Sequence, residues 1–185
     1  MKYRQIACVL AGIGVGLSSV PAVQAKEVTL SAVSFVRLDI DWGILFKAWV
    51  EDVNKTCKGQ VQINLRGGPE VMNPFQQPAA VKNGVIDIAF TIPAFFQGSF
   101  PGALAFNLAK KGPTAQRKDG FYDYVNARLA KTLNARMLLN SSYNVKFHIY
   151  MGKKRLEKAD LTGLKMRSLP IYRPMFEHLG ATAIT

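Results

Sequence analysis

The chain has 185 residues and a formal net charge of +12, from 24 Lys and Arg residues against 12 Asp and Glu residues. This length is enough for one ordinary domain with its own core, or for two small lobes. The two cysteines, Cys8 and Cys57, exclude an internal disulfide in the exported chain, because only Cys57 follows the N-terminal segment described next.

Residues 1–25 have the pattern of a secretory signal peptide. Lys2 and Arg4 precede an apolar run over residues 6–20, and Val23-Gln24-Ala25 supplies the small residues that a signal peptidase accepts. A transmembrane helix is the alternative, but a span needs roughly 18 to 20 apolar residues, and this run is shorter and contains three glycines. We therefore expect cleavage before Lys26 and export of the mature protein to the periplasm.

The excess positive charge lies in the middle of the chain. Residues 110–167 carry fourteen basic residues against four acidic ones, whereas residues 26–109 carry seven of each. One interpretation is a positive field that attracts anionic ligands, polyanions or a membrane surface. The other is a basic, solvated face, which the single basic run Lys153-Lys-Arg155 favours because no aromatic residue interrupts it.

The first part of the chain alternates strand and helix patterns. Strands are predicted around Val28–Ala32, Val61–Leu65 and Val85–Phe90, the last as an apolar run typical of a strand buried on both faces. A helix between the first two strands, capped by Asp39 or Asp41, has an apolar face formed by Trp42, Leu45, Phe46, Trp49 and Val53. With a short helix over residues 76–82, this order predicts a parallel βαβαβ unit.

The rest of the chain is less regular. Residues 91–106 form an aromatic segment broken by Pro and Gly, and a single helix is predicted over residues 114–135, weakened near its start by Gly120. Alternation over residues 137–151 predicts a strand, and a second strand ends at Arg167. A helix over residues 171–179 and a strand from residue 181 follow, and the pattern expects more chain beyond residue 185.

Ligands of open parallel sheets bind beyond the carboxyl ends of the strands. That rule selects Phe35 after the first strand, Thr91 after the third, and Arg167, the only charged residue among these positions. A guanidinium presents paired donors that match a carboxylate. Lys146 and Phe147 lie on opposite faces of one predicted strand, and we expect Lys146 to be able to reach a cleft.

Enzyme signatures are missing from the sequence. The two histidines, His148 and His178, lie on separate predicted elements, and no cluster has the spacing of metal ligands. No nucleophile elbow, P-loop or zinc-protease motif occurs. We therefore expect no catalytic activity, no cofactor, no metal and no nucleic-acid partner.

Three blocks resemble the extracytoplasmic solute-binding subunits of TRAP transporters, the DctP-type family. They are Gly84-Val-Ile-Asp-Ile-Ala-Phe90, Leu161-Thr-Gly-Leu-Lys-Met-Arg167, and the helix from Tyr172 to Gly180 followed by Ala181. The resemblance implies an α/β fold of the type II periplasmic-binding-protein kind, a two-lobed clamshell. It also implies that the protein traps an organic acid and delivers it to a sodium-coupled membrane permease.

By this resemblance Arg167 clamps a carboxylate, and Phe35, Thr91 and Phe147 line the pocket, which Lys146 could also reach from its strand. Aromatic residues stand where many relatives have polar ones, which favours an apolar or aromatic acid over a sugar acid. We expect lobe I over residues 26–143 and the beginning of lobe II over residues 144–185. Family members are much longer, so the fold is expected to be incomplete at the C-terminus, either as a fragment or as a truncated gene product.

Overall fold

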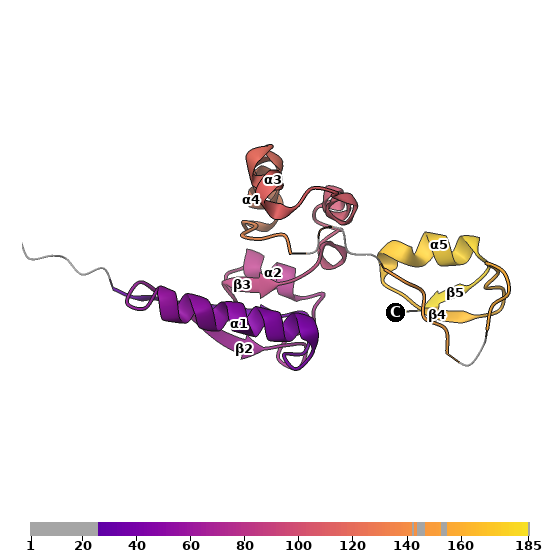
Figure 1. Ribbon diagram of the computed structural model, residues 1–185, viewed down its shortest axis with the longest axis horizontal. Coiled ribbons are helices and arrows are strands. Elements are labelled where there is room, and N and C mark those ends of the chain that lie inside the picture. The colour runs from indigo at the N-terminus through magenta and orange to yellow at the C-terminus, as the bar shows by residue number, and fades with distance from the viewer. Residues whose placement is uncertain (1–25, 142, 144–146, 153–154, 185) are drawn as a thin grey trace, which may run out of the picture.

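The computed structural model describes residues 26–141, 143, 147–152 and 155–184. The predicted signal peptide and Lys146 lie outside the described residues. A three-stranded sheet contains β1 (Val28–Ser34), β2 (Val61–Gly67) and β3 (Ile88–Phe90) in the order β2-β1-β3 (Figure 1). Both strand pairs are parallel, which confirms the predicted βαβαβ unit.

Helix α1 (Asp41–Thr56) covers one face of this sheet. Phe46 and Val50 are buried against residues of β1 and β2, and Trp49 stacks on Phe46 with ring centroids 5.7 Å apart. The prediction that Leu45 shares this face is wrong, because Leu45 is 68% exposed. At about 100° per residue, Leu45 lies roughly 40° beyond Trp49, which is the edge of the stripe that Phe46, Trp49 and Val53 form.

The predicted cap of α1 is also wrong. Ile40 occupies the N-cap position and makes no side-chain cap bond, while Asp41 is already inside the first helical turn. The carboxylate of Asp39 instead accepts hydrogen bonds from Nε of Arg37, at 2.9 Å, and from Nη2 of the same guanidinium. The hydrogen bond from Arg37 lowers the pKa of Asp39 below its ordinary value.

Strand β3 is shorter than the predicted run over residues 85–90. Val85 is 59% exposed and only Ile88–Phe90 pair with β1, so burial of the whole run on both faces is wrong. The chain enters the sheet after Asp87, whose carboxylate accepts hydrogen bonds from the Ser31 backbone at 2.7 Å and hydroxyl at 2.8 Å. Helix α2 (Gln77–Lys82) packs on the sheet face opposite α1.

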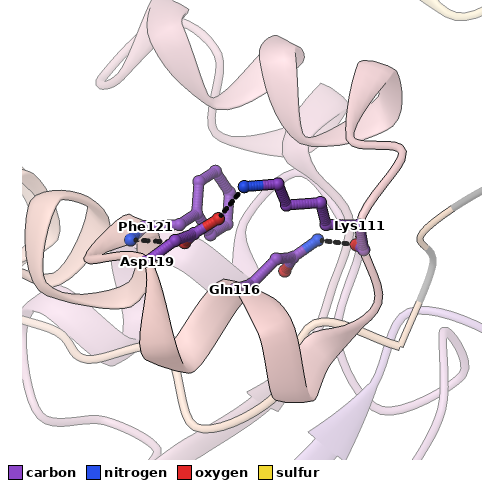
Figure 2. Close-up of polar contacts among 4 residues, drawn as sticks. All are labelled: Lys111, Gln116, Asp119 and Phe121. Atoms are coloured by element: carbon purple, nitrogen blue, oxygen red, sulfur yellow. Dashed lines mark hydrogen bonds and ion pairs between the residues drawn. The ribbon is translucent and has the colours of Figure 1, made fainter.

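The predicted helix over residues 114–135 is two helices, α3 (Pro113–Lys118) and α4 (Phe121–Leu133). Gly120 takes the left-handed conformation, with φ of 82°, and this breaks the helix. Figure 2 shows the corner that results. Asp119 accepts from the Lys111 ammonium at 2.9 Å and from the Phe121 backbone at 3.2 Å, and the Gln116 amide donates to the Lys111 carbonyl at 2.6 Å.

Two 3-10 segments, η1 (Pro93–Phe95) and η2 (Pro101–Leu108), connect the first sheet with these helices. The aromatic segment predicted as irregular therefore contains short helical turns. Its residues bury one face of α4 in a core cluster made of Phe100, Ala103, Phe106, Val125, Leu129 and Leu133.

The last part of the chain has its own small sheet. It contains the parallel strands β4 (Lys165–Arg167) and β5 (Thr182–Ile184), joined through η3 (Pro170–Tyr172) and α5 (Arg173–His178). The strand predicted over residues 137–151 is wrong for the residues that the structure describes there, which have no strand assignment. Alternation alone does not make a strand, because its backbone must also pair with a neighbouring strand.

Within the described part of the chain, no helix is long and apolar enough to cross a membrane.

Candidate ligand site at the sheet ends

Phe35 lies directly beyond the carboxyl end of β1, where the sequence places it. Its backbone N–H donates to the Phe90 carbonyl at 2.9 Å. Its ring is half-buried and lies 5.2 Å from the Phe90 ring, 5.8 Å from Phe95 and 5.9 Å from Trp42, measured between centroids. Tilted and edge-on contacts at these distances are favourable for aromatic pairs, so Phe35 is the centre of an aromatic surface.

Thr91 follows β3. Because Ser34 of β1 pairs with Phe90 of β3, the next residues along the two strands are Phe35 and Thr91. Its hydroxyl oxygen is buried and has no hydrogen-bond partner among the described residues. Thr91 is partly exposed, but its hydroxyl oxygen is not. Such an unpaired oxygen is unusual, because buried hydroxyls are nearly always hydrogen-bonded.

Gln77, at the start of α2, is a residue that sequence reasoning missed. It is fully buried, and its amide nitrogen donates to the Ser34 carbonyl at 2.9 Å and to the Met72 carbonyl at 3.1 Å. Ser34 is also fully buried, and its hydroxyl accepts from the Val36 backbone at 3.1 Å. These bonds fix the backbone on both sides of Phe35.

Arg167 is the last residue of β4 and is exposed. It pairs in register with Ile184 of β5, and the next residue, Ser168, donates its backbone N–H to the Ile184 carbonyl at 2.7 Å. None of the ion pairs among the described residues involves Arg167. Its guanidinium is therefore presented at the carboxyl end of the small parallel sheet, with its donors available to an anion.

Phe147 lies near the turn that follows Arg167. Its ring is 6.1 Å from the ring of Tyr172, a residue of η3, and Phe147 is 55% exposed. Burial of the Tyr172 ring raises the pKa of its phenol above the ordinary value. Tyr172 therefore remains neutral at physiological pH and offers Phe147 an apolar neighbour.

The predicted site residues fall into two groups. Phe35 and Thr91 lie together at the end of the first sheet, and Phe147 and Arg167 lie in the part of the chain that contains β4 and β5. Figure 1 shows these two sheets apart from each other. None of the contacts given above joins the two groups. Lys146 is outside the described residues.

Two hollows on the described surface lie elsewhere. A shallow groove of about 470 Å³ runs between α1 and β2, and its lining includes Lys47, Glu51 and Asn54. A second one is lined by Arg37, Leu38, Asp39, Pro69 and Glu70. Both are at the β2 side of the sheet, and neither is lined by a predicted site residue.

The predicted site residues Phe35, Thr91 and Arg167 thus lie at the carboxyl ends of parallel strands, where open α/β proteins bind their ligands. The family model for bacterial extracellular solute-binding protein, family 7, named DctP, matches residues 39–185. The chain therefore belongs to the DctP family of solute-binding transport proteins, which is not an enzyme family.

Solved structures support the same conclusion. A TRAP solute-binding protein from a marine metagenome, specific for aromatic acid ligands, is 27% identical, with a TM-score of 0.62 over 86% of this chain and 52% of that one. An extracytoplasmic solute receptor from Bordetella pertussis that binds pyroglutamic acid is 15% identical, with a TM-score of 0.64 over 85% and 54%. A TRAP protein from Pseudoalteromonas atlantica, with bound sodium and pyruvate, is 16% identical, with a TM-score of 0.61 over 86% and 50%.

The chain spans about half the length of the solved structures that it matches. These neighbours are two-lobed, which confirms the predicted fold class, with this chain covering part of that fold. The matches at 15% and 16% identity establish the fold alone. The ligand and the roles of individual residues require a separate argument.

Proposed function

We propose that the protein is the periplasmic receptor of a TRAP-type transporter, which captures a small organic acid through Arg167 and delivers it to the membrane permease. The observation that carries this proposal is the guanidinium at the end of β4, which is exposed and takes part in none of the ion pairs of the described residues. A planar, permanently charged fork of donors is suited to a carboxylate.

The cleft would form between two lobes, residues 26–143 and residues 144–185 with whatever chain completes the second lobe. Phe35 and Thr91 would line it from one side. Phe147 and Arg167 would line it from the other, together with Lys146. Closure of such a cleft removes water from around the ligand, which strengthens the pairing between guanidinium and carboxylate.

The ligand side of the proposal is an apolar or aromatic acid. The Phe35 ring has three aromatic neighbours within 6 Å between centroids, and Phe147 is more than half exposed. A sugar acid needs many polar partners, which such rings do not supply. The metagenomic protein at 27% identity is specific for aromatic acids, which agrees with this surface, while the other relatives have different ligands.

The test is thermal denaturation of the complete gene product with a panel of aliphatic, aromatic and sugar acids. A ligand at about one hundred times its Kd stabilises a folded protein by about 2.7 kcal/mol, which is measurable. Arg167→Ala should abolish the shift, and Arg173→Ala, an exposed arginine on α5, is the matched control. A well-folded protein that responds to no acid would reject the proposal.

The alternative prediction, an exported module that binds polyanions or a membrane surface, rests on the positive charge of residues 110–167. Several of these basic residues have internal partners, Lys111 and Arg117 among them. Lys111 pairs with Asp119, and the guanidinium of Arg117 lies 4.3 Å from the centroid of the Tyr122 ring and bonds the Leu138 carbonyl. These contacts favour a structural role. Retention on heparin only at very low salt would dispose of the alternative.

A further inference from the structure

The segment that follows α4 leaves three large apolar side chains in solvent. Leu138 is 55% exposed, Leu139 is 56% exposed and Tyr143 is 42% exposed. A single exposed apolar residue is ordinary, but a group of them on one surface marks a site of interaction. These three residues, all within residues 138–143, form an apolar patch.

Polar contacts hold this segment against α3 and α4, beside which it runs in Figure 1. The backbone N–H of Met137 donates to the Asn126 side chain at 2.7 Å. The backbone N–H of Asn140 donates to the Tyr122 hydroxyl at 2.9 Å, and the buried Asn140 amide donates to the Gln116 side chain at 3.2 Å. The two leucines lie between these anchors, so their backbone is held while their side chains remain in solvent.

The chain around the apolar patch is strongly basic. Residues 110–119 and 136–143 carry five basic residues and one acidic residue. The basic residues are Lys110, Lys111, Arg117, Lys118 and Arg136. Asp119 pairs with Lys111 and neutralises it, and the ion pairs of the described residues involve none of the other four cations. This part of the surface therefore keeps a net positive charge.

Arg117 joins the charge to the apolar patch. Its guanidinium donates to the Leu138 carbonyl and lies 4.3 Å from the centroid of the Tyr122 ring. Both contacts hold the side chain in position, but neither partner carries a negative charge, so the charge of Arg117 remains beside Leu138. The Tyr143 ring packs against Gly112, where an added Cβ would lie 3.5 Å from it, and Gly112 directly follows Lys111 in the chain.

We infer that the apolar patch and the cations around it dock on an anionic lipid bilayer. The cations attract negative headgroups, and the two leucines enter the boundary between headgroups and acyl chains. Tyr143 supplies the aromatic side chain that this boundary favours. Residence on the membrane would keep the proposed receptor near its permease, but the inference does not depend on Arg167.

Charge complementarity selects this partner. Further chain of the same protein could cover the three apolar side chains, but it would also desolvate the unpaired cations, which is costly. An anionic surface pairs with the cations instead. A bilayer fits better than a rigid acidic protein, because protruding leucines enter lipid without a pocket of matching shape.

The test is flotation of the complete gene product, produced from Lys26 onward, with lipid vesicles. One set contains phosphatidylcholine alone, and the other contains phosphatidylcholine mixed with phosphatidylglycerol. Binding to the mixed vesicles should be about tenfold or more stronger than to the neutral ones at low salt, and it should weaken as salt screens the charges.

Two pairs of substitutions separate the apolar and the charged contributions. Leu138→Asn with Leu139→Asn should reduce binding to the mixed vesicles about tenfold or more. The matched control is Ile44→Asn with Leu45→Asn, because these residues of α1 are 52% and 68% exposed and lie outside this surface. Lys110→Gln with Lys118→Gln should also reduce binding severalfold, whereas Lys55→Gln with Lys58→Gln, two exposed lysines at the end of α1, should leave it closer to that of the parent.

Circular dichroism establishes that each variant is folded. The inference is overturned if the folded protein binds neither kind of vesicle, which is also the result expected if further chain covers the apolar patch. It is overturned as well if both kinds of vesicle bind equally, or if the leucine variant binds as the parent does, because charge alone then explains the attraction. Binding to heparin without binding to the mixed vesicles would indicate an acidic macromolecule as the partner and would reject a lipid one. None of these results changes acid binding through Arg167, which is measured separately.

Discussion

The carboxylate of Asp87 joins the entrance of β3 to the middle of β1, and its removal should weaken the first sheet. One oxygen of Asp87 accepts from the Ser31 backbone at 2.7 Å and from the Ser31 hydroxyl at 2.8 Å. The backbone of Asp87 also donates to the Ser31 carbonyl at 3.1 Å, and this bond survives substitution. Asp87→Ala therefore deletes the two side-chain bonds and leaves the backbone path unchanged.

The magnitude follows from the exposure of the carboxylate. Two hydrogen bonds to a buried charged group would contribute about 1.5–3 kcal/mol each. Asp87 is exposed, so water competes for the same oxygen and the contribution must be discounted. We expect Asp87→Ala to lower the free energy of unfolding by about 1–2 kcal/mol at neutral pH.

The effect should also depend on pH. The hydrogen bonds from Ser31 lower the pKa of Asp87 below its ordinary value of 3.8. A carboxyl group with a lowered folded-state pKa stabilises the fold above its unfolded pKa, and this stability is lost as the pH falls through the folded value. The difference between the parent protein and Asp87→Ala should thus be constant above about pH 5 and shrink below about pH 4.

Urea denaturation of the complete gene product, followed by circular dichroism at several pH values from 3.5 to 7, measures this difference. Asp52→Ala on the exposed side of α1 is the control for loss of one negative charge. The reasoning is refuted if Asp87→Ala and Asp52→Ala have equal effects at pH 7, or if the Asp87→Ala difference grows as the solution is acidified.

Three further substitutions test the packing around the sheets. Asn54→Ala should lower the free energy of unfolding by about 1–2 kcal/mol in urea denaturation, because the Asn54 amide bonds the N–H of Ile63 at 2.6 Å and its carbonyl at 2.9 Å; an unchanged midpoint would contradict this. Leu161→Ala should cost about 2–4 kcal/mol, because Leu161 is 2% exposed in the core beneath β4 and β5, and hydrogen exchange of those strands should accelerate first. Gly180→Ala should cost about 1–3 kcal/mol in thermal denaturation, since φ is +86° and the new Cβ would meet Oγ1 of Thr162 at 2.5 Å; a neutral result would show that this turn relaxes easily.

The sequence predicted the first sheet well because its signals are local and agree with burial. Alternation in Val28–Ala32 and Val61–Leu65 and the helical spacing of Phe46, Trp49 and Val53 all describe the faces that become the core. Leu45 shows the limit of this reasoning. Leu45 is about 40° beyond the edge of the stripe and so fits the helical pattern, but its side chain is 68% exposed.

Other errors arose where structure depends on partners distant in the sequence. Phe147 and Ile149 alternate as in a strand, yet they are 55% and 43% exposed and belong to no strand of the described chain. Asp39 has the composition of a helix cap, but Arg37, two residues earlier, takes its carboxylate. In the first case the described residues pair with no neighbouring strand, and in the second a neighbouring side chain takes the carboxylate.

The candidate site was predictable only residue by residue. Phe35, Thr91 and Arg167 could be selected because strand ends are recognisable from sequence and parallel strands present their carboxyl ends together. Gln77 gave no such signal. A glutamine that begins a short surface helix is ordinarily exposed. Its burial follows from α2 lying against the face of the sheet that carries Val33 and Ala89.

The register of the sheet brings the predicted site residues Phe35 and Thr91 to one edge. Pairing of Ser34 with Phe90 brings the Phe35 ring and the Thr91 hydroxyl to the same sheet end, and the Gln77 amide reaches that end through the Ser34 carbonyl. A shift of one residue between the two strands would put these two side chains on opposite faces of the sheet. Ligand binding at this edge, as proposed, should therefore be more sensitive to Gln77→Met, which removes the hydrogen bond to the Ser34 carbonyl, than to changes in the exposed rings alone.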